Sequence, residues 1–121
     1  MRFWLFIAAI YGVLAVAVGA FAAHALKDSL SVASLGVLQT AVHYQFIHAL
    51  ALLLVVVLGL QRPSMALRYS AIFFSLGILL FSGSLYTLVL SPLKPGLVTP
   101  AGGSLLLLGW LSLAYSAWRP E

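Results

Sequence analysis

The sequence has no cysteine, only two acidic residues, and no charged side chain inside any of its long apolar segments. Without cysteine the chain forms no disulfide, no thiolate metal site and no cysteine nucleophile. Charged residues make up 7% of the chain and hydrophobic residues 64%, whereas globular proteins average about 25% and 45–50%. The scarcity of charge therefore excludes a soluble globular domain and indicates a membrane protein.

Four apolar segments account for most of the chain. They cover residues 3–23, 41–60, 69–90 and 101–118. A helix needs about 20 largely apolar residues to cross the hydrocarbon core of a bilayer, and a helix satisfies its own backbone polar groups where lipid cannot. The sequence predicts an all-α integral membrane four-helix bundle, with residues 1–121 forming a single transmembrane domain.

Two stretches allow more than one interpretation. Arg2 and the small residues around Phe21 resemble a signal peptide, but signal cores run about 7–15 residues, so we expect segment 3–23 to be retained as a span. In residues 28–40, Leu30, Ala33 and Val37 recur at helical spacing. This pattern predicts either a short amphipathic surface helix or an extension of the second span.

Basic residues set the expected orientation. An even number of spans puts both termini on the same side as the middle loop, and that side carries four arginines, namely Arg2, Arg62, Arg68 and Arg119. The other side carries Lys27 and Lys94. Because cytoplasmic loops are enriched in Lys and Arg, we expect both termini in the cytoplasm. The six basic residues form no patch, so we expect no nucleic-acid partner.

Small residues and proline predict details of packing. Ala8 and Gly12 lie four residues apart in the first span, and such pairs let helix backbones approach in lipid. A second row continues through Ala15, Gly19 and Ala23, so the first span is expected to be the packing centre. Thr99 before a proline is typical of a helix N-cap, which would begin span four.

The uncharged polar side chains converge on the outer half of the membrane in this orientation. They are His24, Gln39, His43, Tyr44, Gln45, His48, Ser82, Ser84, Tyr86 and Thr99. Polar groups are costly in lipid unless they face protein or water, so the cluster predicts a polar pocket. The positive ends of spans two and four, with Lys27 and Lys94, would favour an anion such as a lipid phosphate or small carboxylate.

Three functions remain open at this stage. The first is a non-enzymatic protein that binds a lipid headgroup or small anion in this pocket, with membrane lipids as partners and no cofactor. The second is an oligomeric transporter or channel subunit, although the spans hold no charged residue for a proton relay. The third is a haem- or metal-binding protein, although His43 and His48 lie about 140° apart on one helix and cannot share a metal. Self-association is open, and no catalytic residue or metal ligand is expected.

Four strings of this sequence resemble one bacterial family. They are Gly19–Lys27, Gln39–Gln45 with His48, Leu80–Tyr86, and Thr99–Gly103 with Gly109 and Trp110. They resemble the YgdD-like family, known as domain of unknown function 423, over essentially the whole chain. The resemblance implies a small, multi-pass, four-helix protein of the bacterial inner membrane without an assigned activity. That family often has glycine where this chain has Ala22 or Ala23.

Overall fold

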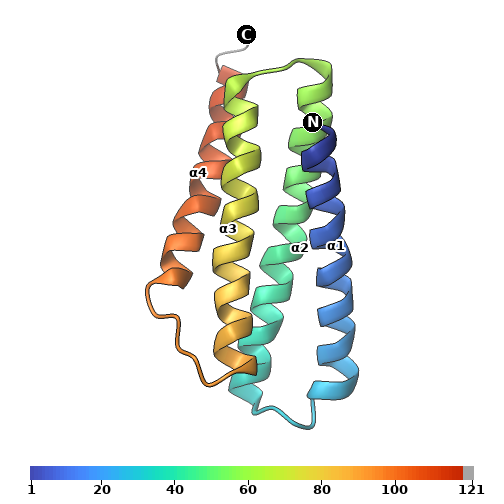
Figure 1. Cartoon of the computed structure of the whole chain (residues 1–121), viewed down its shortest axis with the longest axis vertical. Helices are drawn as coiled ribbons and strands as arrows, with labels where there is room; N and C mark the ends of the chain where they lie inside the picture. Colours follow the sequence, from blue (N-terminus) through green and yellow to red (C-terminus); the bar gives the residue numbers. More distant parts are fainter. Residues whose placement is uncertain (119–121) are drawn as a thin grey trace.

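The computed structural model describes residues 1–118, which form four long helices (Figure 1). They are α1 (Arg2–Phe21), α2 (Val32–Gln61), α3 (Met65–Leu90) and α4 (Val98–Trp118). Each helix is long and apolar enough to cross a membrane. The predicted all-α membrane fold is therefore confirmed.

The segment before the second span extends that span. Helix α2 begins at Val32, where the hydroxyl of Ser31 accepts a hydrogen bond from the Ser34 backbone N–H at 3.0 Å. Its 30 residues correspond to about 45 Å, which is longer than the hydrocarbon core. The end of α1 is similarly prolonged by one π-helical stretch, η1 (Ala22–Leu26). No separate surface helix lies between the two spans in the described residues.

The helices lie side by side in chain order, with α2 and α3 in the middle and α1 and α4 at the edges (Figure 1). Helix α1 packs mainly on α2, and α4 mainly on α3. In their most apolar stretches, α2 and α3 have 44% and 39% of residues buried, against 17% for each edge helix. Both edge helices therefore offer most of their surface to lipid.

Glycines bring α3 and α4 into close contact. A Cβ atom at Gly102 would collide with the backbone nitrogen of Phe81, and one at Gly109 would lie 2.5 Å from the Phe74 ring. Phe74 is fully buried at the centre of the hydrophobic core. Small residues at helix contacts are the usual means of close packing in membranes. These two glycines thus allow α4 to pack closely on α3.

The expectation that the first span is the packing centre is wrong. The buried residues on its inner face are Ala8, Ala15 and Ala22, seven residues apart. Gly12 packs against nothing, since a Cβ atom there would have no neighbour within 4 Å. A seven-residue spacing is that of helices packed at a small crossing angle. The four-residue rows coincide with this face only in part, since a Cβ atom at Gly19 would lie 3.2 Å from Cγ1 of Val42 on α2, whereas Gly12 has open space beside it.

The charged residues are sorted to the two ends of the molecule. Arg62 lies in the α2–α3 turn and Arg2 at the start of α1, near the same end (Figure 1). Lys27 and Lys94 lie in the two connections at the opposite end, which we call the lysine end. Arg119, which contributed to the predicted orientation, lies outside the described residues.

Candidate functional site

The twelve residues predicted to share one pocket are divided among several places in the structure. Three of them, His24, Lys27 and Lys94, are exposed at the lysine end. The other nine lie along different helix–helix contacts. They fall into a network around Gln45, a buried histidine at His48, a set of serine contacts, and a groove between α1 and α2.

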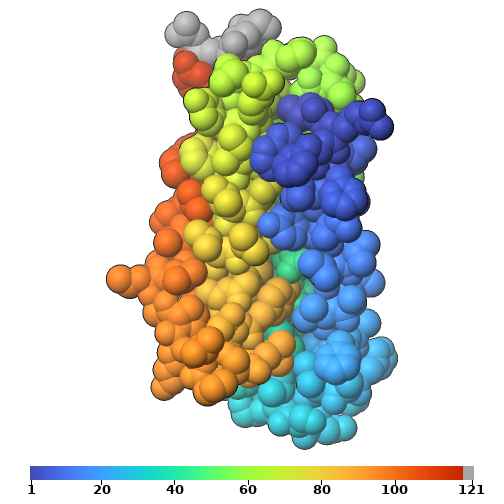
Figure 2. Space-filling view, viewed as in Figure 1, coloured from blue at the N-terminus to red at the C-terminus, as the bar shows by residue number. Residues whose placement is uncertain are grey.

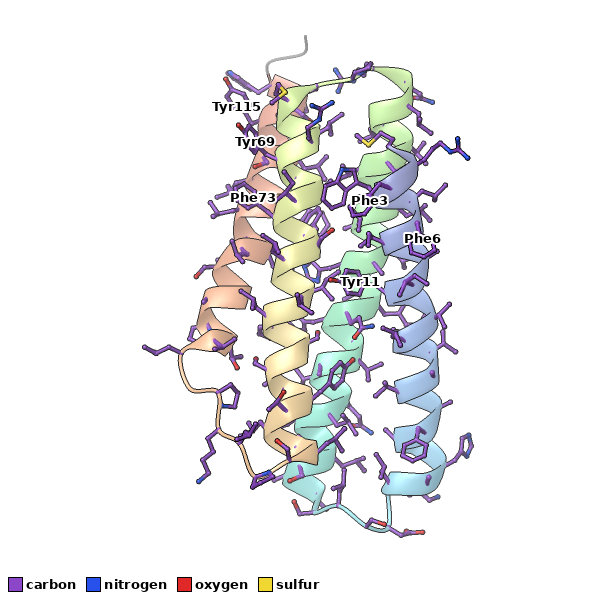
Figure 3. All side chains as sticks on the ribbon, viewed as in Figure 1. Phe3, Phe6, Tyr11, Tyr69, Phe73 and Tyr115 are labelled. Atoms are coloured by element: carbon purple, nitrogen blue, oxygen red, sulfur yellow. The ribbon has the colours of Figure 1, made fainter. Side chains whose placement is uncertain are left out.

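Gln45 joins three helices through hydrogen bonds. Its side chain is buried, with 2% exposed. Its Nε2 donates to the backbone oxygen of Tyr11 at 2.8 Å, and its Oε1 accepts from the hydroxyl of Tyr86 at 2.6 Å. The Tyr11 hydroxyl (Figure 3) in turn donates to the backbone oxygen of Ser75 at 2.8 Å. These bonds tie α1 to α2 and α3.

A shallow groove of about 240 Å³ runs along this network between α1 and α3. Figure 2 shows the seam between the two helices, blue and yellow, with part of α2 visible in green between them. Gln45 and Tyr86 line it, but their polar atoms already bond to each other. The groove therefore has little hydrogen-bonding capacity left, and the network is best explained as structural.

His48 is buried with both ring nitrogens occupied. Its Nδ1 lies 2.7 Å from the backbone oxygen of Tyr44, and its Nε2 lies 3.0 Å from Nε1 of Trp110. An indole N–H only donates and a carbonyl only accepts. His48 is therefore assigned as the neutral tautomer that carries its proton on Nδ1. Its ring lies within 6 Å of the rings of Tyr44, Phe74 and Trp110.

This arrangement gives no support to haem or metal binding by His48. Coordination through Nε2 would require breaking the bond from Trp110, and His24 and His43 are exposed elsewhere. Among residues 1–118, no three His, Asp or Glu side chains gather as a metal site would require.

The predicted serines form hydrogen bonds between helices. Ser82 donates to the backbone oxygen of Ala41 on α2 at 2.8 Å. Ser84 bonds to the hydroxyl of Thr99 on α4 at 2.6 Å. The expectation that Thr99 caps span four is wrong, because α4 begins at Val98 and the Thr99 hydroxyl faces α3 instead. The following Pro100 still lies in the first helical turn, where proline is tolerated.

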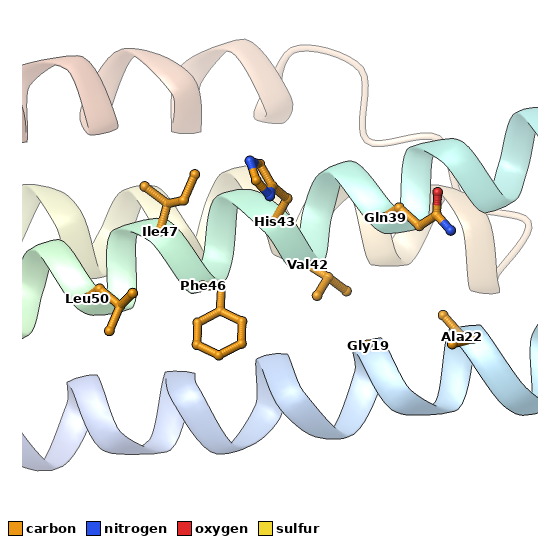
Figure 4. A pocket seen from close by; sticks show the side chains of 9 residues that line it. Gly19, Ala22, Gln39, Val42, His43, Phe46, Ile47 and Leu50 are labelled. Carbon is orange, nitrogen blue, oxygen red and sulfur yellow. The ribbon is translucent and has the colours of Figure 1, made fainter.

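The two remaining residues, Gln39 and His43, line a groove of about 480 Å³ between α1 and α2 (Figure 4). Small residues on the α1 side, Gly19, Ala22 and Ala23, leave this space open. The rest of the lining is apolar and comprises Val42, Phe46, Ile47 and Leu50. The polar side chains lie towards the lysine end and the apolar ones deeper in the membrane. The groove is therefore amphipathic along its length.

Tyr11 and Trp110 are the contacts that the sequence reasoning missed. In the sequence, Trp110 stands out only as part of a string that resembles the family, and Tyr11 belongs to none of the strings. Both are amphipathic aromatics in the interior of a span, whereas such residues prefer the interface. A polar tip at that depth needs a partner, which the structure provides as His48 for Trp110 and Ser75 for Tyr11. The position of these two residues in the middle of their spans is the sequence feature from which the contacts could have been predicted.

Comparison with known proteins shows which family the chain belongs to. Residues 18–103 match the model of a family described as a protein of unknown function, DUF423. The UPF0382 inner membrane protein YgdD of Escherichia coli K12 is 44% identical over 98% of this chain and 91% of its own length. A UPF0382 membrane protein of Haemophilus influenzae is 41% identical over 98% and 95%, respectively.

A more distant relative is a UPF0382 membrane protein of Staphylococcus aureus, with 37% identity over 98% of each chain. No solved structure matches this chain. The family match covers more than half of the residues, and the relatives align over nearly their full length. The chain belongs to the DUF423 (UPF0382) family of membrane proteins.

Proposed function

We propose that this protein binds one phospholipid in the groove between α1 and α2, with the headgroup at Gln39 and His43. The observation that carries the proposal is the amphipathic lining of that groove, which has two polar side chains at one end and apolar ones along the rest. A phospholipid has the same division between headgroup and acyl chain. The protein would act as a non-enzymatic, lipid-binding membrane protein.

The polar end of the groove has unused hydrogen-bonding groups. The side-chain hydrogen bonds of this part of α2 belong to Thr40, Gln45 and His48. Within residues 1–118, neither the Gln39 side chain nor the His43 side chain makes a hydrogen bond, and both side chains are exposed. His43 also lies inside the apolar segment 41–60, where an unpartnered polar group is costly. Ester or phosphate oxygens of a lipid would accept hydrogen bonds from both side chains.

Charge at the same end favours an anionic headgroup. Lys27 follows η1 directly and is exposed at the lysine end. A lysine near the headgroup region attracts anionic lipid by about 1 kcal/mol. The amino end of α2 also points to this end of the molecule and has a partial positive charge. Both effects support phosphate as the group held there.

Removing the polar end should reduce lipid retention. In the double variant Gln39→Ala/His43→Ala, the phospholipid retained in native mass spectrometry should fall about tenfold, because two hydrogen bonds of about 0.7 kcal/mol each are lost. His24→Ala is the matched control, since it removes an exposed histidine that does not line the groove. Equal retention by the double variant and the control would rule out the proposed headgroup site.

We also propose that the protein lies in the bacterial inner membrane with both termini in the cytoplasm, as the arginine distribution indicates. The absence of cysteine permits a clean test by single-cysteine labelling. A membrane-impermeant maleimide should label Ser29→Cys in intact spheroplasts and label Gln61→Cys only after lysis. Both positions are exposed, with Ser29 at the lysine end of the molecule and Gln61 at the opposite end. The reverse pattern would invert the proposed orientation.

A further inference from the structure

We propose that a second groove, between α2 and α4, is a binding site for the planar, carbonyl-bearing ring of a membrane-soluble molecule of the quinone class. The groove measures about 450 Å³. Its lining comprises Tyr44, His48, Phe81, Pro100, Gly103, Ser104, Leu106, Leu107 and Trp110. It is separate from the α1–α2 groove and shares no lining residue with it.

Aromatic rings form one continuous wall of this groove. The ring centres of Tyr44 and Phe81 lie 4.7 Å apart, and those of Tyr44 and His48 are stacked at 5.8 Å. His48 meets Trp110 edge to face at 5.8 Å. Tyr44 is 41% exposed and Trp110 42% exposed, so both remain accessible. A flat unsaturated ring gains more from such a surface than an acyl chain does, because aromatic rings attract one another beyond simple burial.

The wall is held in place by a buried hydrogen-bonded support. His48 is only 6% exposed, and it accepts the indole N–H of Trp110 while bonding to the backbone of Tyr44. Trp110 lies in the middle of α4, far from the interface where tryptophan is usually found. The chain thus buries a histidine in the membrane to fix an indole ring that is half exposed to the groove. His48 is in this sense a positioning residue.

One donor in the groove is free to bind a ligand. Within residues 1–118 the Tyr44 hydroxyl has no protein partner, whereas the Ser104 hydroxyl already donates to the backbone oxygen of Pro100 at 2.9 Å. A phenol beside a ring-lined wall suits a ligand with an acceptor oxygen on a planar ring. Gly103 adds no side chain to this space, and Leu106 and Leu107 offer an apolar surface for a tail.

Fluorescence of Trp110 tests the site directly. In lipid nanodiscs, Trp4→Phe/Trp118→Phe leaves Trp110 as the reporter, and Trp4→Phe/Trp110→Phe leaves Trp118, which lies outside the groove, as the matched control. Titration with decylubiquinone should quench Trp110 saturably and quench Trp118 only in proportion to the quinone in the bilayer. Adding Tyr44→Phe to the Trp110 reporter should weaken binding about fivefold, because one hydrogen bond is lost. Tyr69→Phe, far from the groove, should not.

Equal, non-saturating quenching of both reporters would overturn the proposal, as would displacement of quenching by phospholipid alone. A second measurement does not depend on tryptophan variants. Organic extraction of the wild-type protein purified in mild detergent should yield close to one quinone per chain, and Tyr44→Phe should yield several times less. Extraction of no quinone from wild-type protein, with no saturable quenching, would show that the ring-lined wall is only a packing feature.

Discussion

Replacing Gly102 with alanine should lower the free energy of unfolding by about 3 kcal/mol, the upper part of the usual range for overpacking. The added Cβ would collide with the Phe81 backbone nitrogen and lie 2.7 Å from the Phe81 Cα. These are main-chain atoms of α3, so no side chain can rotate away to make room. Either α4 moves outward along its length or the helix contact opens.

The neighbouring glycine is the matched control for this result. At Gly103 an added Cβ would lie 3.7 Å from Cδ2 of Phe81, an ordinary contact. Gly103→Ala should therefore keep the stability within about 0.5 kcal/mol of wild type, as for a surface substitution. Both variants should be compared by reversible unfolding in detergent. If the two alanines had equal effects, helix propensity rather than the α3–α4 contact would explain them.

Replacing Gln45 with leucine should cost about 2 kcal/mol of stability. The change leaves the Tyr86 hydroxyl without its partner and removes the additional bond to the Tyr11 backbone oxygen, which keeps its bond within α1. An unsatisfied buried group costs about 1–3 kcal/mol. Helix α1 should be affected most, because its direct contact with α3 is small and this network supplements it. Faster hydrogen exchange in α1 than in α4 would report that local loosening.

A double-mutant cycle separates the network from simple packing. Gln45→Leu and Tyr86→Phe should be non-additive, since the first change already removes the bond that the second removes. Thr40→Ala is a suitable control, because that exposed hydroxyl bonds only within its own helix. Strict additivity of Gln45→Leu with Tyr86→Phe would mean that the 2.6 Å bond adds nothing to stability.

The sequence predicted the number, type and approximate limits of the spans because hydrophobicity and length alone decide which segments enter a bilayer. It also predicted a single pocket of polar residues towards the lysine end. It could not predict how they divide there. Tyr44 and Gln45 are adjacent, yet Gln45 is 2% exposed and Tyr44 41%. Which face of α2 is buried depends on where α1, α3 and α4 lie around it, and helical periodicity does not contain that information.

The position of α1 illustrates the same limit. Small residues occur on several faces of the helix, yet the residues of α1 that are buried are Ala8 and Ala15, and a Cβ atom at Gly19 would lie 3.2 Å from Val42 of α2. In a membrane, an apolar side chain is as stable facing lipid as facing another helix. The hydrophobicity of its residues therefore does not show which face of a helix makes the contact. The edge positions of α1 and α4 follow from the three-dimensional contacts alone. The grooves beside α2 exist because those edges do not close around it.

Photocrosslinking with a phospholipid that has a diazirine on its acyl chain would test lipid binding most directly. After irradiation in vesicles, peptide mapping should find adducts concentrated on Phe46, Ile47 and Leu50, which line the α1–α2 groove. Gln39→Ala/His43→Ala should reduce those adducts and leave the others unchanged. Adducts spread evenly over lipid-exposed positions such as Val13, Leu54 and Leu111 would show that this groove holds no particular lipid and would contradict the proposed function.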